Sequence, residues 1–97
     1  NMTQKEYEKL NNLQKEFMDT LHRAFEIGDP KDELAHKAVD LHRKWLCFFW
    51  DEYSKEAHVG LCQMYIDDKR FRDYYDKLKP GVVEFLKEAV LAYTGLD

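Results

Sequence analysis

The chain has 97 residues, which is enough for one small domain with a single core. Apolar residues make up 44% of it and charged residues 35%, with four glycines and two prolines, so disorder and a β-sandwich are both excluded. The 15 basic and 19 acidic residues give a formal charge of −4, and no net positive field holds such a chain to DNA or to an anionic membrane. We therefore expect a helical globule that does not bind nucleic acid by itself.

The sequence predicts a cytoplasmic protein. No stretch approaches the ~18 apolar residues of a membrane span, and the N-terminal stretch lacks the basic start and apolar centre of a signal peptide. Cys47 and Cys62 are too few for a disulfide scaffold and lack the paired spacing of a zinc site, so we expect two reduced thiols. The start, Asn1 before Met2, suggests a tag remnant or a domain cut from a longer protein.

A long helix is expected at the start of the chain. Thr3 followed by Glu6 is a capping box, in which each side chain accepts a hydrogen bond from the other residue's backbone N–H. Apolar residues then recur at spacings of three and four and line one helical face: Tyr7, Leu10, Leu13, Phe17, Leu21 and Phe25. Gly28 is expected to end this helix at its C-terminus.

A second helix is expected to follow at once, with Asp29 as its N-cap and Pro30 at its first position. Its apolar stripe consists of Leu34, Ala38, Leu41, Trp45, Phe48 and Phe49. Residues 46–50 are apolar on every side, so the last turns of this helix should be enclosed by other helices or face a cavity or a partner.

The second half of the chain predicts three more helical segments. Ser54 is expected to cap the first of them, which contains Gly60 at a cost of about 1 kcal/mol relative to alanine. Such a glycine often marks the close approach of another helix or a ligand. Asp68 is expected to cap a short helix, and Pro80–Gly81 to precede a last helix that Gly95 ends. Without any period-two alternation, the pattern predicts an all-α domain of four to five helices.

The sequence offers no support for catalysis or for metal binding. No two of the four histidines have the i, i+4 spacing that places two ligands on one helix face, and the histidine–cysteine pair at that spacing, His58 and Cys62, is too few ligands for a zinc site. There is no glycine-rich phosphate loop, no serine elbow and no pair of carboxylates in an apolar setting. We therefore expect no enzymatic activity, no cofactor and no metal.

The distribution of aromatic residues is the informative feature, since nine of the fourteen lie between Trp45 and Tyr75. One interpretation is that they pack the core, as aromatic stripes at helical spacing usually do. The other is that some line an apolar cleft, in which polar tips such as those of Tyr53, His42 and His58 orient a large planar or apolar ligand. A small core cannot easily close over nine rings, which favours the second interpretation for part of the set.

The same region carries a family pattern. Its stretches are His42 to Trp45, Tyr53 to His58, Gly60-Leu61, Met64 to Phe71, Tyr74 to Asp76 and Pro80 to Leu86. In this order they resemble the TipAS antibiotic-recognition domain, the C-terminal effector-binding domain of TipA-type regulators in the MerR family. The pattern covers roughly residues 40 to 94, whereas residues 3–39 agree only as amphipathic helices.

The resemblance implies a compact, globin-like packing of helices around a hydrophobic cleft that takes up bulky peptide-like antibiotics such as thiopeptides. In the full-length regulators a winged helix-turn-helix and a coiled-coil dimerisation helix precede this domain. Residues 1–97 are therefore expected to form a single ligand-binding domain, a C-terminal fragment whose DNA binding and dimerisation belong to the missing part. Shorter family members sequester a drug, and that alternative stays open, as does a helical interaction module that uses residues 46–50.

The large number of aromatic residues in this region and the family resemblance together predict the ligand-binding residues. These are His42, Trp45, Phe49, Tyr53, His58, Leu61 and Tyr65. The turn from Asp68 to Phe71 is expected to have structural roles only. The thiopeptide-capturing prototype of the family has a cysteine just ahead of the helix that carries the counterpart of His58, where this chain has none at residues 50–54. Cys47 and Cys62 are expected in buried surroundings that keep a thiol unreactive, so binding should be non-covalent.

Overall fold

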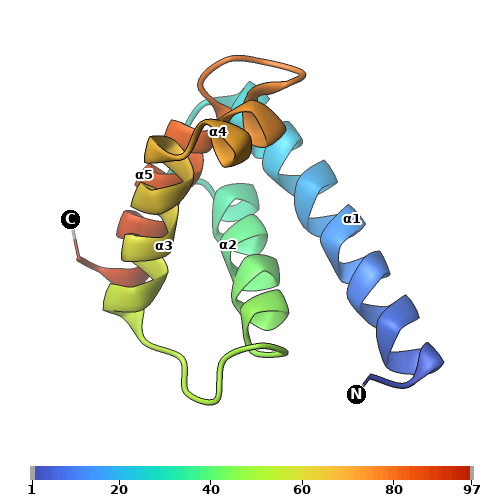
Figure 1. The fold of residues 1–97 in the computed structure, drawn as a ribbon. Helices are drawn as coiled ribbons and strands as arrows, with labels where there is room; N and C mark the ends of the chain where they lie inside the picture. The colour runs from blue at the N-terminus through green and yellow to red at the C-terminus, as the bar shows by residue number, and fades with distance from the viewer. Residues whose placement is uncertain (1, 97) are drawn as a thin grey trace.

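The computed structural model describes residues 2–96, which form one compact helical body with a radius of gyration of 13.0 Å. Its helices are α1 (Gln4–Ile27), α2 (Glu33–Leu46), α3 (Lys55–Asp67), α4 (Lys69–Asp76) and α5 (Val82–Thr94), as Figure 1 shows. No strand occurs in this part of the chain. The prediction of a compact all-α domain of four to five helices is confirmed, although Asn1 and Asp97, at the ends of the expected domain, lie outside the described residues.

The last helix organises the packing. α1 lies along α2, α3 lies along α5, and α5 also contacts α1, α2 and α4. Side chains from α5 therefore supply much of the core, namely Val82, Val83, Phe85, Leu86, Ala89 and Val90. In Figure 1, α4 crosses one end of the bundle, the α2–α3 loop lies at the other end, and the first half of α1 leans outward. Within residues 2–96, no helix is both long enough and apolar enough to cross a membrane.

Most helix ends lie where local chemistry predicts them. The hydroxyl of Thr3 accepts from the backbone N–H of Glu6 at 3.1 Å, and the Glu6 carboxylate accepts from the N–H of Thr3 at 3.1 Å. Gly28 ends α1 in the left-handed conformation, with φ of 84°. Ser54 and Asp68 cap α3 and α4 through side-chain oxygens. The capping box, the stop and both caps are confirmed.

The prediction that Asp29 caps α2 is wrong. The carboxylate of Asp29 instead accepts from the N–H of Lys31 at 2.9 Å and closes a turn. α2 begins after Asp32, whose carboxylate accepts from the N–H of Leu34 at 2.9 Å. Both aspartates can cap a helix, but Asp29 directly follows the left-handed Gly28, and the chain needs these residues to reverse direction before α2 can pack on α1.

The expected extension of α2 to Phe49 is also wrong. α2 ends at Leu46, and the chain tightens into i→i+3 bonds, in which the N–H of Phe48 donates to the carbonyl of Trp45 and that of Phe49 to the carbonyl of Leu46. The side chain of Phe49 is 54% exposed, so residues 46–50 are not enclosed on all sides by other helices. This change of direction brings Phe49 to the surface beside Trp45.

Gly60 does not mark a close approach, contrary to expectation, because a Cβ atom built there meets no atom within 4 Å. Replacing Gly60 with alanine should therefore stabilise the protein by roughly 0.5–1 kcal/mol, since alanine restricts the unfolded chain and suits the interior of α3. Urea denaturation would measure this gain. Gly81→Ala is the matched contrast, since Gly81 has φ of 95° and the substitution should destabilise by about 1 kcal/mol or more. Loss of stability in Gly60→Ala would contradict the prediction.

Candidate functional site

Four of the expected site residues form one buried hydrogen-bonded chain. Nδ1 of His42 on α2 lies 2.8 Å from Nε2 of His58 on α3. The other ring nitrogen of His58, Nδ1, lies 2.6 Å from the hydroxyl of Tyr53 in the α2–α3 loop. Nε2 of His42 lies 3.4 Å from the hydroxyl of Tyr65, which follows His58 on α3. The chain therefore runs Tyr53, His58, His42, Tyr65 and joins the loop and both helices.

The chain accepts only two proton arrangements. A neutral imidazole has one N–H donor and one acceptor nitrogen, so each bond determines the direction of the next. Either Tyr53 donates to His58, His58 to His42 and His42 to Tyr65, or all three bonds point the other way. In both arrangements every ring nitrogen has a partner. Within residues 2–96, no buried side-chain nitrogen or oxygen lacks a hydrogen-bond partner, and the two histidines follow that rule.

Both histidines are held neutral. The rings of His42 and His58 are 1% and 0% exposed, and this burial lowers the pKa of His42 to about 3, with the neighbouring His58 adding to the effect. Burial likewise lowers the pKa of His58 to about 4, and the positive charge of Arg43 adds to that shift. The guanidinium of Arg43 lies 4.3 Å from the centre of the Tyr53 ring and covers that end of the chain. Protonation of both rings would set two N–H donors against each other at the His42–His58 contact and break that bond.

His42 belongs to a closed ring of aromatic contacts as well. Its imidazole stacks on Phe17 of α1 with centroids 4.8 Å apart, and its edge meets Tyr65 of α3 at 6.0 Å. Tyr65 lies 5.0 Å from Tyr75 of α4, and Tyr75 meets Phe17 at 6.3 Å. One side chain from each of α1, α2, α3 and α4 therefore meets at this point. We call these four residues the aromatic ring cluster.

Two adjoining hollows lie on the outer side of that cluster. The larger, of about 410 Å³, is lined by Gln14, Trp45, Tyr65, Arg70, Phe71, Tyr74 and Tyr75. The smaller, of about 270 Å³, is lined by Trp45, Leu46, Phe49, Trp50, Leu61, Met64, Tyr65 and Phe71. They share Trp45, Tyr65 and Phe71, and we call the two together the aromatic cleft. The volume of the larger hollow lies in the range of pockets that hold drug-sized molecules, and the smaller hollow adjoins it.

The seven expected site residues divide into two groups. Trp45, Phe49, Leu61 and Tyr65 line the aromatic cleft. His42, Tyr53 and His58 do not line either hollow; they lie behind its wall, where the His42 ring stacks on Trp45 at 6.0 Å and 9° between planes. The first group faces the hollows, and the second packs behind their wall.

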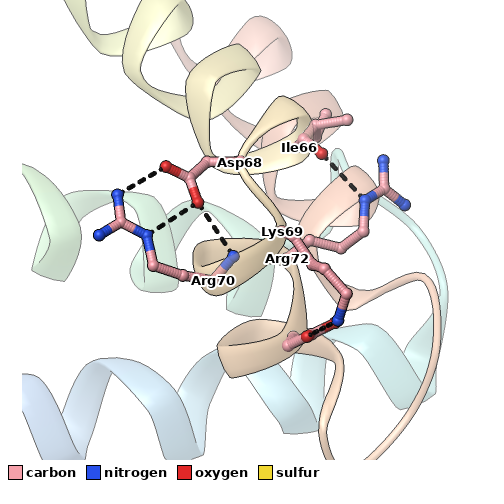
Figure 2. Close-up of polar contacts among 6 residues, drawn as sticks. Ile66, Asp68, Lys69, Arg70 and Arg72 are labelled. Carbon is pink, nitrogen blue, oxygen red and sulfur yellow. Dashed lines mark hydrogen bonds and ion pairs between the residues drawn. The ribbon is translucent and has the colours of Figure 1, made fainter.

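The cleft also contains residues that sequence reasoning missed. Gln14 of α1 donates from its amide to the hydroxyl of Tyr74 at 3.1 Å, which brings two helices together at the rim. Arg70 and Phe71, expected to be structural, both line the larger hollow. Figure 2 shows the guanidinium of Arg70 turned onto the carboxylate of Asp68, with bonds of 2.9 and 3.2 Å. On α4, Tyr74 follows Arg70 by four residues and Phe71 by three, and this spacing was the signal that could have found them.

The same junction of α3 and α4 is held by a second arginine. Nε of Arg72 donates to the carbonyl oxygen of Ile66 at 2.9 Å, as Figure 2 also shows. The carboxylate of Asp76 then accepts from the N–H of Val83 at 3.0 Å and supplies the cap that Gly81 lacks at the start of α5. Side chains at both ends of this short helix therefore set the position of the cleft wall.

The two thiols lie in different surroundings. Cys62 is fully buried, as expected, and burial raises the pKa of its thiol to about 12. Cys47 was expected to be buried and is instead exposed, because α2 ends before it and the chain turns outward. It lines a separate groove of about 770 Å³ between α1 and α2, together with Lys5, Lys9, Leu13, Arg43 and Phe48 among others. This groove shares no lining residue with the aromatic cleft.

Among residues 2–96, no group of three or more His, Cys, Asp and Glu side chains could hold a metal ion.

A drug-sized hollow walled by aromatic side chains places the domain in the class of small helical domains with an aromatic cleft. A family model described as the TipAS antibiotic-recognition domain matches residues 1–93, and the chain belongs to that family. The resemblance stated from the sequence is confirmed.

Three curated relatives are similar to the chain. The HTH-type transcriptional activators TipA of Streptomyces coelicolor and of Streptomyces lividans are each 34% identical over 79 residues, covering 76% of this chain and 31% of the relative. The HTH-type transcriptional activator mta of Bacillus subtilis is 31% identical over 64 residues, covering 66% of this chain and 25% of the relative. The chain thus spans about a third of the length of these relatives or less. No solved structure matches, so the globin-like packing stays an expectation.

The free energy of unfolding should fall as the pH is lowered below about 6.5. The unfolded chain then protonates His42 and His58, whereas the folded chain keeps both neutral until their lowered pKa values of about 3 and 4 are reached. Each histidine should contribute a slope of roughly 1.4 kcal/mol per pH unit within this window. Urea denaturation at several pH values between about 7 and 5 measures the slope. His42→Gln should reduce it, and a wild-type stability independent of pH in this range would contradict the prediction.

Proposed function

We propose that the domain is the effector-binding domain of a MerR-type transcriptional regulator, and that it binds a bulky hydrophobic or peptide-like antibiotic in the aromatic cleft without a covalent bond. The observation that carries the proposal is the cleft itself, found in a chain that belongs to the TipAS antibiotic-recognition family. The family is one of effector-binding domains and is not an enzyme family, which agrees with a binding role.

The lining supports a ligand with large apolar surfaces. Trp45, Tyr65 and Phe71 lie at the centre, where both hollows meet, and can stack on flat rings or contact apolar groups. Phe49 lines only the smaller hollow and Tyr74 only the larger, and the two residues are 54% and 41% exposed. A ligand that covered both residues would bury aromatic surface that now faces water, and this burial would supply much of the affinity.

The buried chain of Tyr53, His58, His42 and Tyr65 has a positioning role in this proposal. It holds Trp45 and Tyr65 at the back of the cleft, and these come from two different helices. A ligand in contact with Trp45 of α2, Tyr65 of α3 and Tyr74 of α4 would favour the arrangement in which the three helices lie at their present positions. Such differential binding is what lets a ligand shift a conformational equilibrium.

We propose that DNA binding and dimerisation belong to a part of the native protein outside this chain, and that the protein acts in the cytoplasm. The support is that the relatives are named as HTH-type activators and are about three to four times as long as the matched region. The gene sequence upstream of Asn1 is the decisive observation. A preceding helix-turn-helix and heptad helix would support the regulator; a native start at Met2 would favour the alternative of a stand-alone drug-sequestering protein.

The exposed Phe49 favours a second candidate, a helical interaction module, because an exposed ring beside Met64, which is also exposed, could pack on a partner helix. The two candidates differ in what fills the cleft. A small molecule that reaches Tyr65 and Phe71 must enter the hollow, whereas a partner helix can rest on its rim.

Thiopeptide binding should quench tryptophan emission, since Trp45 and Trp50 both line the cleft. Tyr74→Ala should weaken this binding roughly five- to tenfold, because an aromatic contact at the rim is lost. Tyr7→Ala is the matched control: Tyr7 is a similarly exposed tyrosine on α1 that lines neither hollow, and its replacement should leave the affinity unchanged.

The measurement is a fluorescence titration with a panel of thiopeptides and other large hydrophobic drugs, checked by thermal shift. An absence of response to the whole panel at tens of micromolar would count against the cleft as a drug site. Equal loss of affinity in both tyrosine variants would place the binding site elsewhere.

Incubation with a dehydroalanine-bearing thiopeptide should leave the intact mass of the protein unchanged. Cys62 is buried with a raised pKa, so it offers little thiolate, and Cys47 lies in the separate groove between α1 and α2, away from the proposed binding site. Intact-mass spectrometry is the measurement, with Cys47→Ser as the control. An adduct that Cys47→Ser abolishes would contradict non-covalent binding and identify the nucleophile.

A further inference from the structure

The charge of the aromatic cleft is carried by a single residue. Of the side chains that line the two hollows within residues 2–96, Arg70 is the only one with a formal charge, and none is a carboxylate. Every other polar side-chain group in the lining is neutral: the amide of Gln14, the indole N–H groups of Trp45 and Trp50, and the hydroxyls of Tyr65, Tyr74 and Tyr75. A site for a cationic drug would need an acidic side chain in its wall, and this lining does not supply one.

The guanidinium of Arg70 is held in place and still has donors to offer. Its Nε and Nη2 atoms donate to the two carboxylate oxygens of Asp68, at 3.2 and 2.9 Å (Figure 2). A guanidinium has five N–H groups, so three remain for another acceptor. Asp68 also caps α4 through the backbone N–H of Arg70, which ties the orientation of the side chain to the start of the helix that carries it. The side chain is 85% exposed, so a ligand can reach it.

A second donor stands on the same hollow. The hydroxyl of Tyr74 accepts a hydrogen bond from the amide of Gln14 at 3.1 Å. Its own proton is then free to be donated, since a phenol both accepts and donates. Tyr74 and Arg70 both come from α4 and both line the larger hollow. Two donors, one of them charged, therefore stand at the edge of an aromatic wall.

We propose that the aromatic cleft selects planar aromatic molecules that carry one anionic group, a carboxylate or a sulfonate, at an edge. The rings would lie against Trp45, Tyr65 and Phe71, and the anionic group would accept from Arg70 and Tyr74. This inference rests on the proposed function, because it assigns a ligand class to the same cleft. Orientation in the cleft then follows from the ligand, since its charged edge must point toward α4.

Two probes that differ in one group test the proposal. Anilinonaphthalene sulfonate carries a sulfonate, phenylnaphthylamine has the same rings without it, and both become fluorescent in apolar surroundings. The quantity to measure is the ratio of their dissociation constants. Arg70→Gln should shift this ratio roughly two- to fivefold against the sulfonate, which is the strength of an exposed ion pair. Arg70→Lys should keep most of the preference, because it keeps the charge.

Lys69→Gln is the matched control. It removes the same charge from the neighbouring position of α4, but Lys69 pairs with Asp73 and lines neither hollow, so the ratio should stay at its wild-type value. The backbone cap from Asp68 does not depend on the Arg70 side chain, and circular dichroism checks that both variants keep their helices.

The outcomes separate this inference from the proposed function. If both probes bind, Tyr74→Ala weakens both, and Arg70→Gln leaves the ratio unchanged, the cleft stands as a ligand site and the anionic preference is overturned. An equal shift of the ratio in Lys69→Gln overturns it too, since the effect is then one of overall charge. If neither probe binds, or Tyr74→Ala affects neither, the anionic preference is overturned, and the titration with the drug panel decides separately whether the cleft is a drug site.

Discussion

The hydrogen bond between His42 and His58 is the contact on which the rest of the cleft depends. It joins α2 to α3 in a dry environment, where each ring nitrogen must have a partner because water cannot replace it. His42 also lies under Trp45 and within hydrogen-bond reach of Tyr65, so two cleft residues from two helices rest on one imidazole. Removing the His42 ring would leave both a cavity and an unpaired ring nitrogen on His58. In this domain the buried polar chain therefore supports the back of the aromatic cleft.

Hydrogen bonds from polar side chains also hold α4 in position. This helix has eight residues, too few to be stable through its own backbone bonds. Asp68 caps the helix, and the side chain of Arg72 donates a hydrogen bond to the backbone at the end of α3. The carboxylate of Asp76 accepts a hydrogen bond from a backbone N–H in the first turn of α5. Tyr75 is the one buried residue of α4 and enters the aromatic ring cluster. Few apolar contacts and several well-placed hydrogen bonds together position the wall that carries Arg70 and Tyr74.

Local chemistry was predictable from the sequence, and contacts between helices were not. The caps at Thr3, Ser54 and Asp68 depend on residues a few positions apart, and all three were found. The cap of α2 was placed three residues early, because Asp29 and Asp32 have the same chemistry and only the path of the chain after α1 decides between them. In the cleft, Trp45, Phe49, Leu61 and Tyr65 were expected, whereas Gln14 and Arg70 were not. His42 and His58 were both singled out, but a separation of sixteen residues gave no sign that they meet.

The aromatic ring cluster has one side in the core and one side in the cleft. Phe17 and His42 are buried and line neither hollow, whereas Tyr65 and Tyr75 line the larger one. Close packing means that the tyrosines cannot move without changing their contacts with the other two rings. Phe17 belongs to α1, whose first half buries Leu10 alone, so this helix is held mainly by its second half. Tyr75 contacts Phe17 of α1 directly, and Tyr65 reaches Phe17 through the ring of His42. The wall of the larger hollow is therefore connected through these rings to α1, the helix that the core holds over only part of its length.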